Sequence, residues 1–518
     1  MPESRKLSGR FDLAVIGGGV HGAAAALEAT RLGWKVLLVE RSDFCSGTSA
    51  NSLRIIHGGL RYLQSASIRR SRESAREQHR LLESAPQMVR PLDCLMGTDA
   101  SLARGRAAMA IGLWFYDRIV CLGLSDRTPG RLLPAAEAGR LAGVDVFRHC
   151  TGAAQWRDAR VVDSERLVLA YLLTAEREGA CILNHTAVVD VSPGTPATLE
   201  IRDAFSGETR TVQADQVIDT AAFIEPHRYW SRAVNLVLDK RVSDYALGLK
   251  LGGADREAGR LFFATPLGGR TAVGTWYFPD RADSPEQLAP AELDRCLSDV
   301  RELLPDLDLR DSDVSRVHLG RLPVRDPSDP LSLLDKPVIR SLSRDGRIVG
   351  VTGVKFTTAH PTAVKALRKA GLASGREPRQ TIPWYGTGLP LDTIERRVRN
   401  RLAEAGQAAL SDIVARRLSR QYGSAAAAIA KLAVEIPRGC ERIPECDGLR
   451  AEIDYCIDNE HCRTLSDFLV RRSGIGSLAR PPAAAVEYCA GVMADRFGWD
   501  AGRVAAEIDH LTASFRHC

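Results

Sequence analysis

The first forty residues alternate between short apolar runs and a helical pattern. Leu13-Ala14-Val15-Ile16 is a continuous apolar run, which is typical of a strand buried on both faces of a parallel sheet. The alanine-rich segment from Ala23 to Arg31 predicts a helix, and the apolar run from Lys35 to Val39 predicts the next strand. The chain therefore opens with a strand, a helix and a strand, as a doubly wound α/β sheet does.

Three glycines separate the first strand from the helix at G-x-G-x-x-G spacing. Gly17 allows a tight turn, Gly19 lets the backbone approach a pyrophosphate, and Gly22 lets the helix pack close to the strand. The start of the helix offers N–H groups and the positive end of its dipole to phosphates. Glu40, at the end of the second strand, can bond a ribose diol. The pattern predicts a dinucleotide site. It occurs both in proteins that bind FAD and in proteins that bind NAD, so it does not distinguish them.

Two segments after Glu40 are candidates for contacts with a cofactor and a substrate. The loop of residues 41–49 is rich in small polar residues that can wrap a pyrophosphate or a ribityl chain, although an ordinary connector has the same composition. In the segment 50–64 a glycine pair can bring the backbone close to a planar ring, and an arginine fork with a tyrosine hydroxyl suits an anion. These residues are His57, Gly58, Gly59, Arg61 and Tyr62.

The remaining chain divides by its hydrophobic pattern. Residues 86–148 are predicted to be mainly helical, and residues 168–219 to form a helix followed by strands. Residues 232–320 alternate between apolar and polar over short runs, which predicts an antiparallel sheet. A short strand at 348–351 precedes a helix that ends near residue 372, and residues 392–514 are predominantly helical.

Composition narrows the class of protein. With 518 residues, 45% hydrophobic and 26% charged, the chain is expected to form two or three globular domains. The net charge of +6 is too diffuse to indicate nucleic acid. No apolar run reaches 18 residues, so a spanning helix is not expected and any membrane contact would be peripheral.

The 12 cysteines are scattered, and the polar N-terminus has no apolar signal region, so reduced thiols in the cytoplasm are expected. The spacing of four of them fits no compact zinc pattern, and no metal site is predicted. These are Cys440, Cys446, Cys456 and Cys462.

An aromatic cluster, Trp114-Phe115-Tyr116, lies in a segment with helical apolar spacing. Large apolar side chains at such spacing usually belong to a core. Because Arg104, Arg106 and Arg118 are nearby, the same groups would also suit a membrane surface.

Several motifs together resemble the FAD-dependent, aerobic-type glycerol-3-phosphate dehydrogenase family, within the flavoproteins built like D-amino-acid oxidase. They extend over nearly the whole chain, and IIHGGLRYL is the most specific of them. The motifs are IGGGVHGAAAALEATRLG, GTSANS, IIHGGLRYL, GLWFYD, DAR, SERL and VTGVKFTT, followed by the helical tail.

The resemblance implies three domains: a Rossmann-like FAD-binding domain, an antiparallel-sheet substrate domain and a C-terminal helical domain. The expected boundaries are 11–75, 147–230 and 320–375 for the first, 76–146 and 231–319 for the second, and 383–516 for the third.

The resemblance also assigns residues to the cofactor. Lys355 lies at the lysine of the family's GGKLTT motif, which reaches both substrate and flavin, and the backbone of Val188 is expected to contact the adenine. The full set expected to bind FAD is Gly17, Gly19, Gly22, Glu40, Thr48, Ser49, Ser52, Gly58, Gly59, Val188, Ala222, Gly353, Lys355 and Thr357.

On the substrate side, Arg61 and Tyr62 are expected to hold the anionic end of the substrate. Arg321 or Arg325 would assist them. His57 is the candidate base, and Lys355 is its competitor.

The chain departs from the family pattern in four motifs, including the segment Ala222-Phe223-Ile224, which replaces Gly-Pro-Trp. Asn235 stands where Lys-Gly-x-His has its substrate-contacting histidine, and Leu322 stands at the arginine of Gly-Val-Arg-Pro-Leu. Ala222 replaces the glycine of Asn-Ala-x-Gly-Pro-Trp, and Val354 replaces the second glycine of GGKLTT. The first two changes concern the substrate and the last two the cofactor.

The expected reaction is oxidation of sn-glycerol 3-phosphate to glycerone phosphate by hydride transfer to flavin N5. Electrons would pass to a quinone, with oxygen as the other acceptor, in a cytoplasmic protein with peripheral contact to the inner face of the cell membrane. One alternative is a flavin enzyme for another hydroxy acid, amine or phosphorylated polyol. A second alternative is a flavin-binding protein without catalysis.

Overall fold

The computed structural model describes residues 9–60, 67–101, 105–125, 128–227, 229–252, 260–280, 287–372 and 383–515, except for the side chains of residues 408–411. Its contacts divide the chain into two units, each built from separate stretches of sequence. Unit 1 comprises residues 1–49, 163–228 and 335–516, and unit 2 comprises residues 50–162 and 229–334 with the last two residues.

The sheet of unit 1 is parallel along most of its width. β1 (Arg10–Ile16) lies between β10 (Thr209–Asp219) and β2 (Val36–Val39), and all three run in one direction. β17 (Ile348–Thr352) and β7 (Cys181–Leu183) extend the sheet in parallel, and β16 (Val338–Ser341) adds an antiparallel edge. Buried parallel strands need apolar side chains on both faces, which explains the continuous apolar runs in the sequence.

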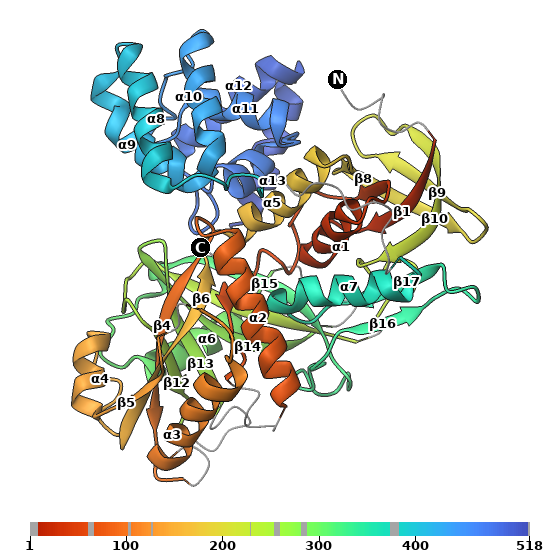
Figure 1. The fold of residues 1–518 in the computed structure, drawn as a ribbon. Helices are drawn as coiled ribbons and strands as arrows, with labels where there is room; N and C mark the ends of the chain where they lie inside the picture. The colour runs from red at the N-terminus through yellow and green to blue at the C-terminus, as the bar shows by residue number, and fades with distance from the viewer. Residues whose placement is uncertain are drawn as a thin grey trace. The chain divides into compact units, whose positions relative to one another are not determined.

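Helices and a strand hairpin form the other layers of unit 1. α1 (Val20–Arg31) packs against α5 (Ser164–Arg177) and α7 (Ala359–Lys369), and Figure 1 shows the three helices together beside the sheet. β8 (Thr186–Ser192) and β9 (Ala197–Asp203) pair with each other, and β9 continues the sheet through β10. Side chains of this hairpin and of the parallel strands share one buried apolar cluster.

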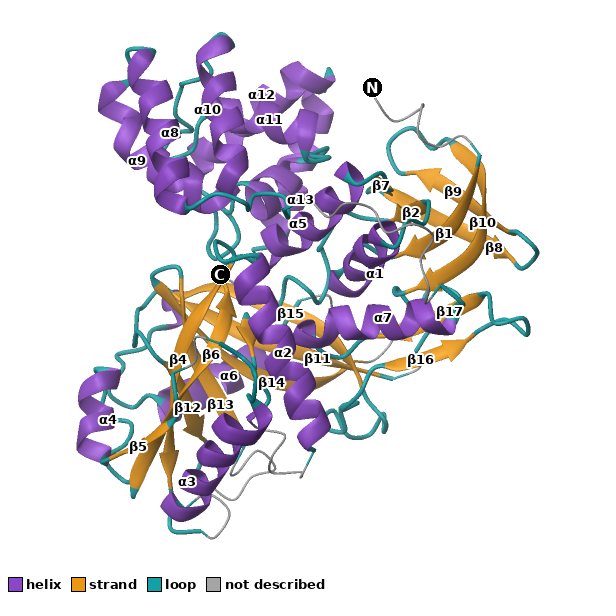
Figure 2. Cartoon of the chain, viewed as in Figure 1, coloured by secondary structure: helices purple, strands orange, loops and turns teal. Residues whose placement is uncertain are grey.

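The C-terminal part of unit 1 is a group of helices, drawn in blue in Figure 1 and in purple in Figure 2. Its main helical elements include a π-helical segment, η7, between α11 and α12. They are α8 (Leu391–Glu404), α9 (Ala408–Tyr422), α10 (Ala426–Glu435), α11 (Arg450–Asn459), η7 (Asp467–Arg472), α12 (Ala483–Phe497) and α13 (Ala501–Ala513).

Unit 2 is built on a mostly antiparallel sheet with the strand order β15-β11-β14-β13-β12-β4-β6-β3. Among its described strands, only β12 and β4 pair in parallel, and β5 pairs with β6 outside this path. The strands are β3 (Ile55–Ile56), β4 (Val89–Thr98), β5 (Arg131–Leu133), β6 (Gly152–Val161), β11 (Trp230–Leu238), β12 (Ala246–Lys250), β13 (Leu261–Leu267), β14 (Arg270–Asp280) and β15 (Val314–Pro323).

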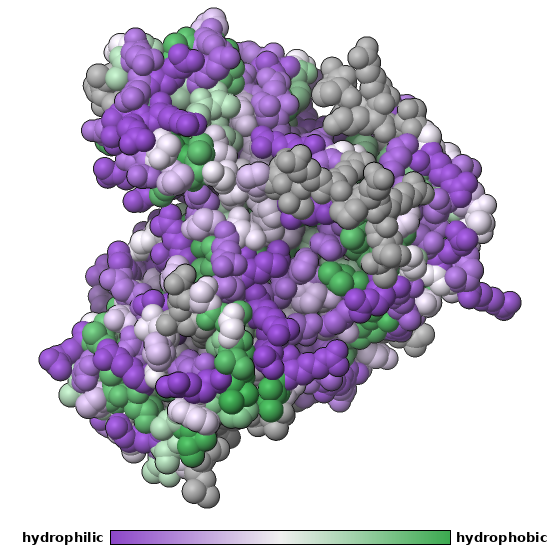
Figure 3. All heavy atoms as spheres, viewed as in Figure 1, coloured by the Kyte–Doolittle hydropathy of each residue, from purple (hydrophilic) through white to green (hydrophobic). Residues whose placement is uncertain are grey.

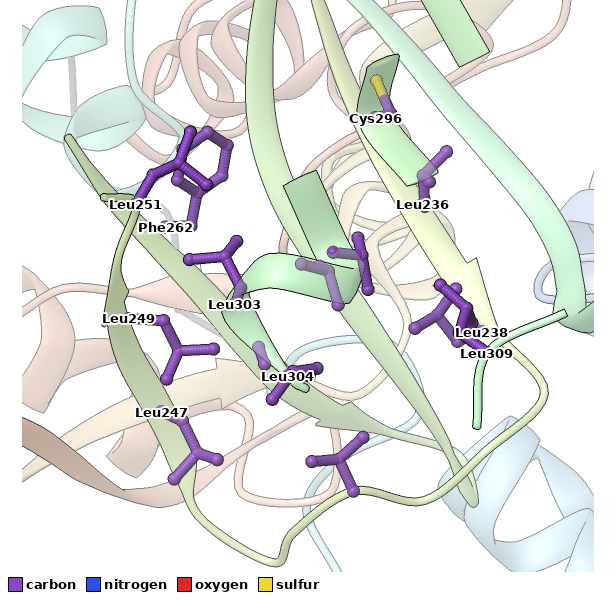
Figure 4. Close-up of a cluster of buried hydrophobic side chains, with 14 of the residues drawn as sticks. Leu236, Leu238, Leu247, Leu249, Leu251, Phe262, Cys296, Leu303, Leu304 and Leu309 are labelled. Atoms are coloured by element: carbon purple, nitrogen blue, oxygen red, sulfur yellow. The ribbon is translucent and has the colours of Figure 1, made fainter. Parts of the chain in front are cut away.

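One face of this sheet carries the core of unit 2. α6 (Pro290–Leu303) packs there, and leucines from the strands and from the end of the helix interlock around Leu303 and Leu304 (Figure 4). Elsewhere in unit 2 lie α2 (Ile68–Ser84), α3 (Arg106–Phe115) with its π-helical extension η3 (Tyr116–Val120), and α4 (Ala135–Ala142). Because side chains alternate along a strand, the opposite face of the same strands is available for other contacts.

The predicted fold class is confirmed: an α/β unit with a parallel sheet, an antiparallel-sheet unit and a C-terminal helical part are all present. The helical prediction for residues 86–148 is wrong for residues 89–98, which form β4. Val89, Leu92 and Met96 recur at helical spacing, and the pairing with β6 overrides that local pattern.

Residues 50–75 and 147–162, expected in the FAD-binding domain, lie in unit 2, because β3 and β6 are strands of its sheet. In the described part of the chain no helix combines the length and the hydropathy needed to cross a membrane.

Candidate active site

The predicted glycine turn connects β1 to α1 in unit 1, and it is closely packed. A Cβ atom on Gly22 would lie 1.9 Å from the carbonyl oxygen of Gly17, and Gly17 itself has φ of +106°. No acidic side chain occupies the first turn of α1, and the Val20 N–H donates to Ser49 Oγ at 3.1 Å. The positive end of the helix dipole is therefore held at the carboxyl end of β1, where a phosphate is favoured.

The loop of residues 40–49 folds around this turn. The Glu40 carboxylate accepts hydrogen bonds from the Gly18 N–H at 2.6 Å and from the Ser42 N–H at 2.9 Å. The buried Phe44 ring fills the space beside Gly18, where a Cβ would lie 2.8 Å from that ring. Glu40 thus shapes the turn through its backbone bonds, and its contact with a ribose stays a prediction, as do those of Thr48 and Ser49 with a cofactor.

A second turn, after β10, contains the alanine that replaces the family's glycine. Ala222 has φ of +54°, in the left-handed region where glycine is favoured and other residues are strained by about 1–2 kcal/mol. The buried Asp219 carboxylate accepts hydrogen bonds from the N–H groups of Ala221 and Ile224 and holds this turn. Burial raises the pKa of Asp219. Ala222 therefore adopts a backbone conformation that glycine favours, despite its methyl group.

His21, between the glycines of the fingerprint, was not predicted as a site residue. Its side chain is half-buried, and the desolvation of its ring lowers its pKa to about 4, so its imidazole is neutral near pH 7. A Cβ on Gly353 would lie 2.3 Å from His21 Cε1, so the turn after β17 approaches the start of α1 closely. Among the described residues, His21 Nε2 has no hydrogen-bond partner. The sequence held one signal for His21: it is a polar residue within the otherwise apolar first turn of the helix.

These features fit a bound dinucleotide. The glycine turn, the Gly353 turn and an orphaned buried imidazole nitrogen meet in unit 1, and a buried polar atom without a partner indicates a ligand that supplies one. Val188 lies in β8 beside a strand irregularity, and Thr357 is buried in the short helix η5 (Phe356–Thr358). Lys355 precedes η5, half-buried, with Nζ 3.4 Å from the Asp335 carbonyl oxygen.

In unit 2, His57 is fixed by a buried carboxylate. His57 Nδ1 lies 3.0 Å from Asp158 Oδ2, and the Gly58 N–H donates to Asp158 Oδ1 at 2.8 Å. Burial alone would raise the pKa of Asp158, but the bonds from His57 and Gly58 bring it below its usual value. The pairing of β3 with β6 brings the two residues together, since His57 follows β3 and Asp158 lies in β6. Asp158 thus orients the imidazole and leaves Nε2 for a reacting group.

The glycine pair after His57 is required by packing within unit 2. A Cβ on Gly58 would lie 2.1 Å from Tyr116 Oη, and one on Gly59, which has φ of +96°, would lie 2.8 Å from the Ser71 backbone of α2. This packing explains why glycine is needed at both positions. Their predicted contact with the flavin stays a prediction. Ser52 Oγ accepts a hydrogen bond from the Arg54 N–H at 3.2 Å. Arg61 and Tyr62 lie outside the described residues.

Asn235 occupies a buried polar position in β11, and the register of the sheet pairs it with a histidine. Asn235 Oδ1 accepts a hydrogen bond from Thr275 Oγ1 at 2.7 Å. Its direct partner across β15 is His318, which is also buried. Directly opposite side chains lie on the same face of a sheet, about 5 Å apart at Cβ. An imidazole therefore stands beside the position where the family has its histidine, and sequence reasoning missed it.

The predicted arginines of β15 have a different setting. Arg321 is three residues after His318, so alternation along the strand places its side chain on the opposite face. There Arg321 Nε forms an ion pair with Asp280 at 2.9 Å. Arg325 follows the strand and is exposed. This placement lends no support to a substrate contact by Arg321.

Because His21 is neutral when folded and titrates near its ordinary pKa of 6.5 when unfolded, its burial makes stability depend on pH. Between pH 6.5 and 4 only the unfolded chain takes up this proton, so acidification favours unfolding. We predict that lowering the pH from 7 to 5 removes about 2 kcal/mol of stability through His21. In His21→Gln the difference in unfolding free energy between these pH values, measured by urea titration of the apoprotein, should shrink by that amount. An unchanged difference would show that His21 takes up its proton as readily in the folded as in the unfolded chain.

Comparison with known proteins agrees with this geometry. A family model described as FAD dependent oxidoreductase matches residues 12–365, and one described as the C-terminal domain of alpha-glycerophosphate oxidase matches residues 386–504. The chain is 27% identical over 491 residues to the aerobic glycerol-3-phosphate dehydrogenase of Staphylococcus haemolyticus, covering 90% of this chain and 86% of that one. It is 27% identical over 527 residues to the glycerol-3-phosphate dehydrogenase of Synechocystis, covering 94% and 93%.

Solved structures have the same fold. The glycerol-3-phosphate dehydrogenase from Bacillus halodurans, complexed with FAD, matches with a TM-score of 0.76 at 22% identity, over 100% of this chain and 96% of that one. The FAD-bound L-alpha-glycerophosphate oxidase from Mycoplasma pneumoniae matches with a TM-score of 0.54 at 15% identity, over 73% and 100%. The glycine turn, the converging loops and a family match over more than half of the sequence lead to one conclusion: the chain belongs to the FAD-dependent oxidoreductase family.

Proposed function

We propose that this enzyme oxidises sn-glycerol 3-phosphate to glycerone phosphate. The observation that carries the proposal is the pairing of His57 with the buried Asp158 carboxylate, because oxidation of a secondary alcohol needs a base for the hydroxyl proton. The names of the similar proteins, which include glycerol-3-phosphate dehydrogenases and a glycerophosphate oxidase, support the choice of substrate.

FAD, when bound, supplies the acceptor for the hydride of the carbinol carbon. In the proposed scheme His57 Nε2 takes the hydroxyl proton, because Nδ1 is engaged with Asp158. The buried carboxylate then stabilises the imidazolium that forms and keeps the ring in orientation. Residues of the glycine turn, the 40–49 loop and the Gly353 turn would hold the dinucleotide.

Positive and polar groups would bind the substrate. We assign the phosphate to Arg61 and Tyr62, following the family motif, and the reacting oxygen to Lys355. Asn235 and His318 together would take the place of the histidine that the family has on this strand. His318 can donate or accept a proton at its ring nitrogens, which Asn235 alone cannot do near pH 7.

We further propose that the electrons pass to a quinone and that α3 and η3 contact the membrane surface. Large apolar side chains are exposed here: Ile111 is 68% and Trp114 60% exposed in α3, and Leu122, just after η3, is 69% exposed. Figure 3 shows hydrophobic residues gathered over this part of unit 2. The exposed Arg118 lies within this stretch. A bulky apolar patch with a cationic side chain fits the interface of an anionic bilayer.

One alternative has specific support. Leu322 stands at the family's arginine position, and the histidine of this sheet, His318, lies on β15 opposite Asn235, so the same chemistry would accommodate a different hydroxy acid, amine or phosphorylated polyol. A non-catalytic flavin protein is the second alternative, and the pairing of His57 with the buried Asp158 carboxylate argues against it.

The substrate assignment is tested by mixing the oxidised holoenzyme with sn-glycerol 3-phosphate in the absence of oxygen. We expect the flavin absorbance near 450 nm to bleach within seconds. The same measurement with glycerol, 2-hydroxy acids and amines is the control for specificity. Bleaching only by one of those compounds would transfer the assignment to it, and bleaching by none would favour the non-catalytic alternative.

The role of Asp158 is tested by Asp158→Asn. The amide cannot stabilise an imidazolium, so we expect the rate constant of flavin reduction to fall by about 10²-fold while FAD stays bound. Asp93→Asn is a matched control, because Asp93 also lies in the sheet of unit 2 but pairs with Arg157. Equal rates in the Asp158 variant and the wild type would remove His57 as the base and leave Lys355 as the candidate.

Membrane contact is tested by sedimentation with phosphatidylglycerol vesicles. Replacing Trp114 by Ser removes the largest apolar group of the patch, and we expect vesicle affinity to fall by about tenfold. Ile413→Ser, at an exposed residue of α9 in unit 1, should leave it unchanged. Reduction of the flavin by substrate should be normal in both variants. Equal vesicle affinity of the two variants would contradict the assignment of this surface.

A further inference from the structure

The buried side chain of Asp43 attaches the loop of residues 40–49 to the C-terminal helices, and the Phe44 ring adds an edge contact with His461. Its carboxylate accepts two hydrogen bonds from the Arg472 guanidinium, at 2.5 and 2.8 Å, and one from Arg471 Nε at 2.5 Å. Asn184 Nδ2 donates to the same carboxylate at 2.8 Å. Asp43 and Arg472 are both without solvent exposure at their side chains. This is a fully desolvated, bidentate ion pair between segments far apart in the sequence.

The two arginines are themselves held in place by the C-terminal part. Both lie at the end of η7, whose first residue, Asp467, accepts a hydrogen bond from Arg471 at 2.8 Å and pairs with His185 Nε2 at 2.8 Å. Arg472 Nε donates to the Glu460 carbonyl oxygen at 3.0 Å. Burial opposes the charge of both carboxyls, but Arg472 and Arg471 keep the pKa of Asp43 below its usual value. His185 and the same two arginines do so for the pKa of Asp467.

This cluster resembles a metal site but is better explained by its arginines. Ligand atoms of Asp43, His185 and Asp467 lie within 4.8 Å of one another. Each carboxylate, however, already accepts hydrogen bonds from a guanidinium, and Arg472 bonds Asp43 with two nitrogens. Two arginine charges balance the two aspartates, so the cluster needs no cation.

Asp43 is next to the residues that shape the proposed cofactor site. Phe44, the following residue, packs beside Gly18, and the Cys45 N–H donates to the Gly18 carbonyl oxygen at 3.1 Å. Ser49 in the same loop accepts from the first amide of α1. If Asp43 loses its partners, its charge is relieved when the loop moves toward water, and that movement takes Phe44 and Ser49 away from the glycine turn.

We propose that Arg471 and Arg472 are positioning residues for FAD: through Asp43 they hold the 40–49 loop in the conformation that receives the cofactor, and so couple FAD binding to the C-terminal helices. This inference rests on the proposed placement of FAD at the glycine turn. The coupling is reciprocal. If the ordered η7 segment increases the affinity for FAD by a given factor, bound FAD must favour the ordered η7 segment by that same factor.

The first test measures FAD affinity by titrating apoprotein and following flavin fluorescence. Arg472→Met keeps the length of the side chain and removes the guanidinium, and we expect the Kd for FAD to rise by roughly 30-fold or more. The matched control is Arg417→Met. Arg417 pairs with the buried Glu452 carboxylate at 2.6 Å and donates to the carbonyl oxygen of Ser473, just after η7, at 3.4 Å. Among the described residues it makes no hydrogen bond or ion pair with Asp43 or the rest of the 40–49 loop. This control should lower thermal stability and keep the Kd within about twofold.

The second test detects the coupling itself by hydrogen exchange. In the wild type, FAD should slow amide exchange in residues 460–472 as well as in the loop. In Asp43→Asn, which keeps the shape of the side chain without its charge, FAD should slow the loop but no longer residues 460–472. If Arg472→Met does not fold, Arg471→Met and Asp43→Asn provide the same two measurements.

The outcomes separate this inference from the proposed function. A wild type that takes up no FAD contradicts the placement of the cofactor and with it the proposed reaction. A wild type that binds FAD, together with unchanged affinity and unchanged exchange coupling in the variants, overturns the positioning role alone. Equal loss of affinity in the Arg417 control would assign the effect to general destabilisation and would also overturn it.

Discussion

The close approach of backbone to backbone at the glycine turn is the constraint on which unit 1 depends. A methyl group on Gly22 would overlap the carbonyl oxygen of Gly17, so the start of α1 can pack here only without a side chain. β1, β2, β10 and β17 are parallel, and their carboxyl ends lie along one edge of the sheet. The glycine turn, the 40–49 loop, the 219–224 turn and the Gly353 turn all leave from that edge. A ligand bound there therefore meets four separate segments of the chain.

Local signals were sufficient for the elements of this unit. Continuous apolar runs mark buried parallel strands, and glycines at fixed spacing mark the turn, so both could be predicted without any knowledge of pairing. The same reasoning was wrong for β4, whose apolar residues happen to follow a helical period. The sheet of unit 2 is joined from strands far apart in sequence, and only their pairing decides which segments belong to it.

The candidate site shows the same division. His57, Gly353 and Lys355 were predicted because each lies within a short motif. The pairing of Asp158 with His57, and of Arg472 with Asp43, depends on contacts between distant segments. Charged residues in a helical tail usually face solvent, so nothing in the sequence distinguished the two buried arginines of η7 from the many exposed ones. Hydrophobic and polar pattern predicts elements well, but it does not predict which charges are buried together.

The pairing of Asn235 with His318 has a consequence for how sites of this kind change over time. In an antiparallel sheet two residues that are distant in the chain share one small volume, so a functional group can pass from one strand to its neighbour while its place in space is nearly kept. A protein that has lost a motif residue has then not necessarily lost the chemistry. Where a relative lacks a histidine at the position of Asn235 on β11, the residue on β11 and its opposite residue on β15 are best considered together as one position.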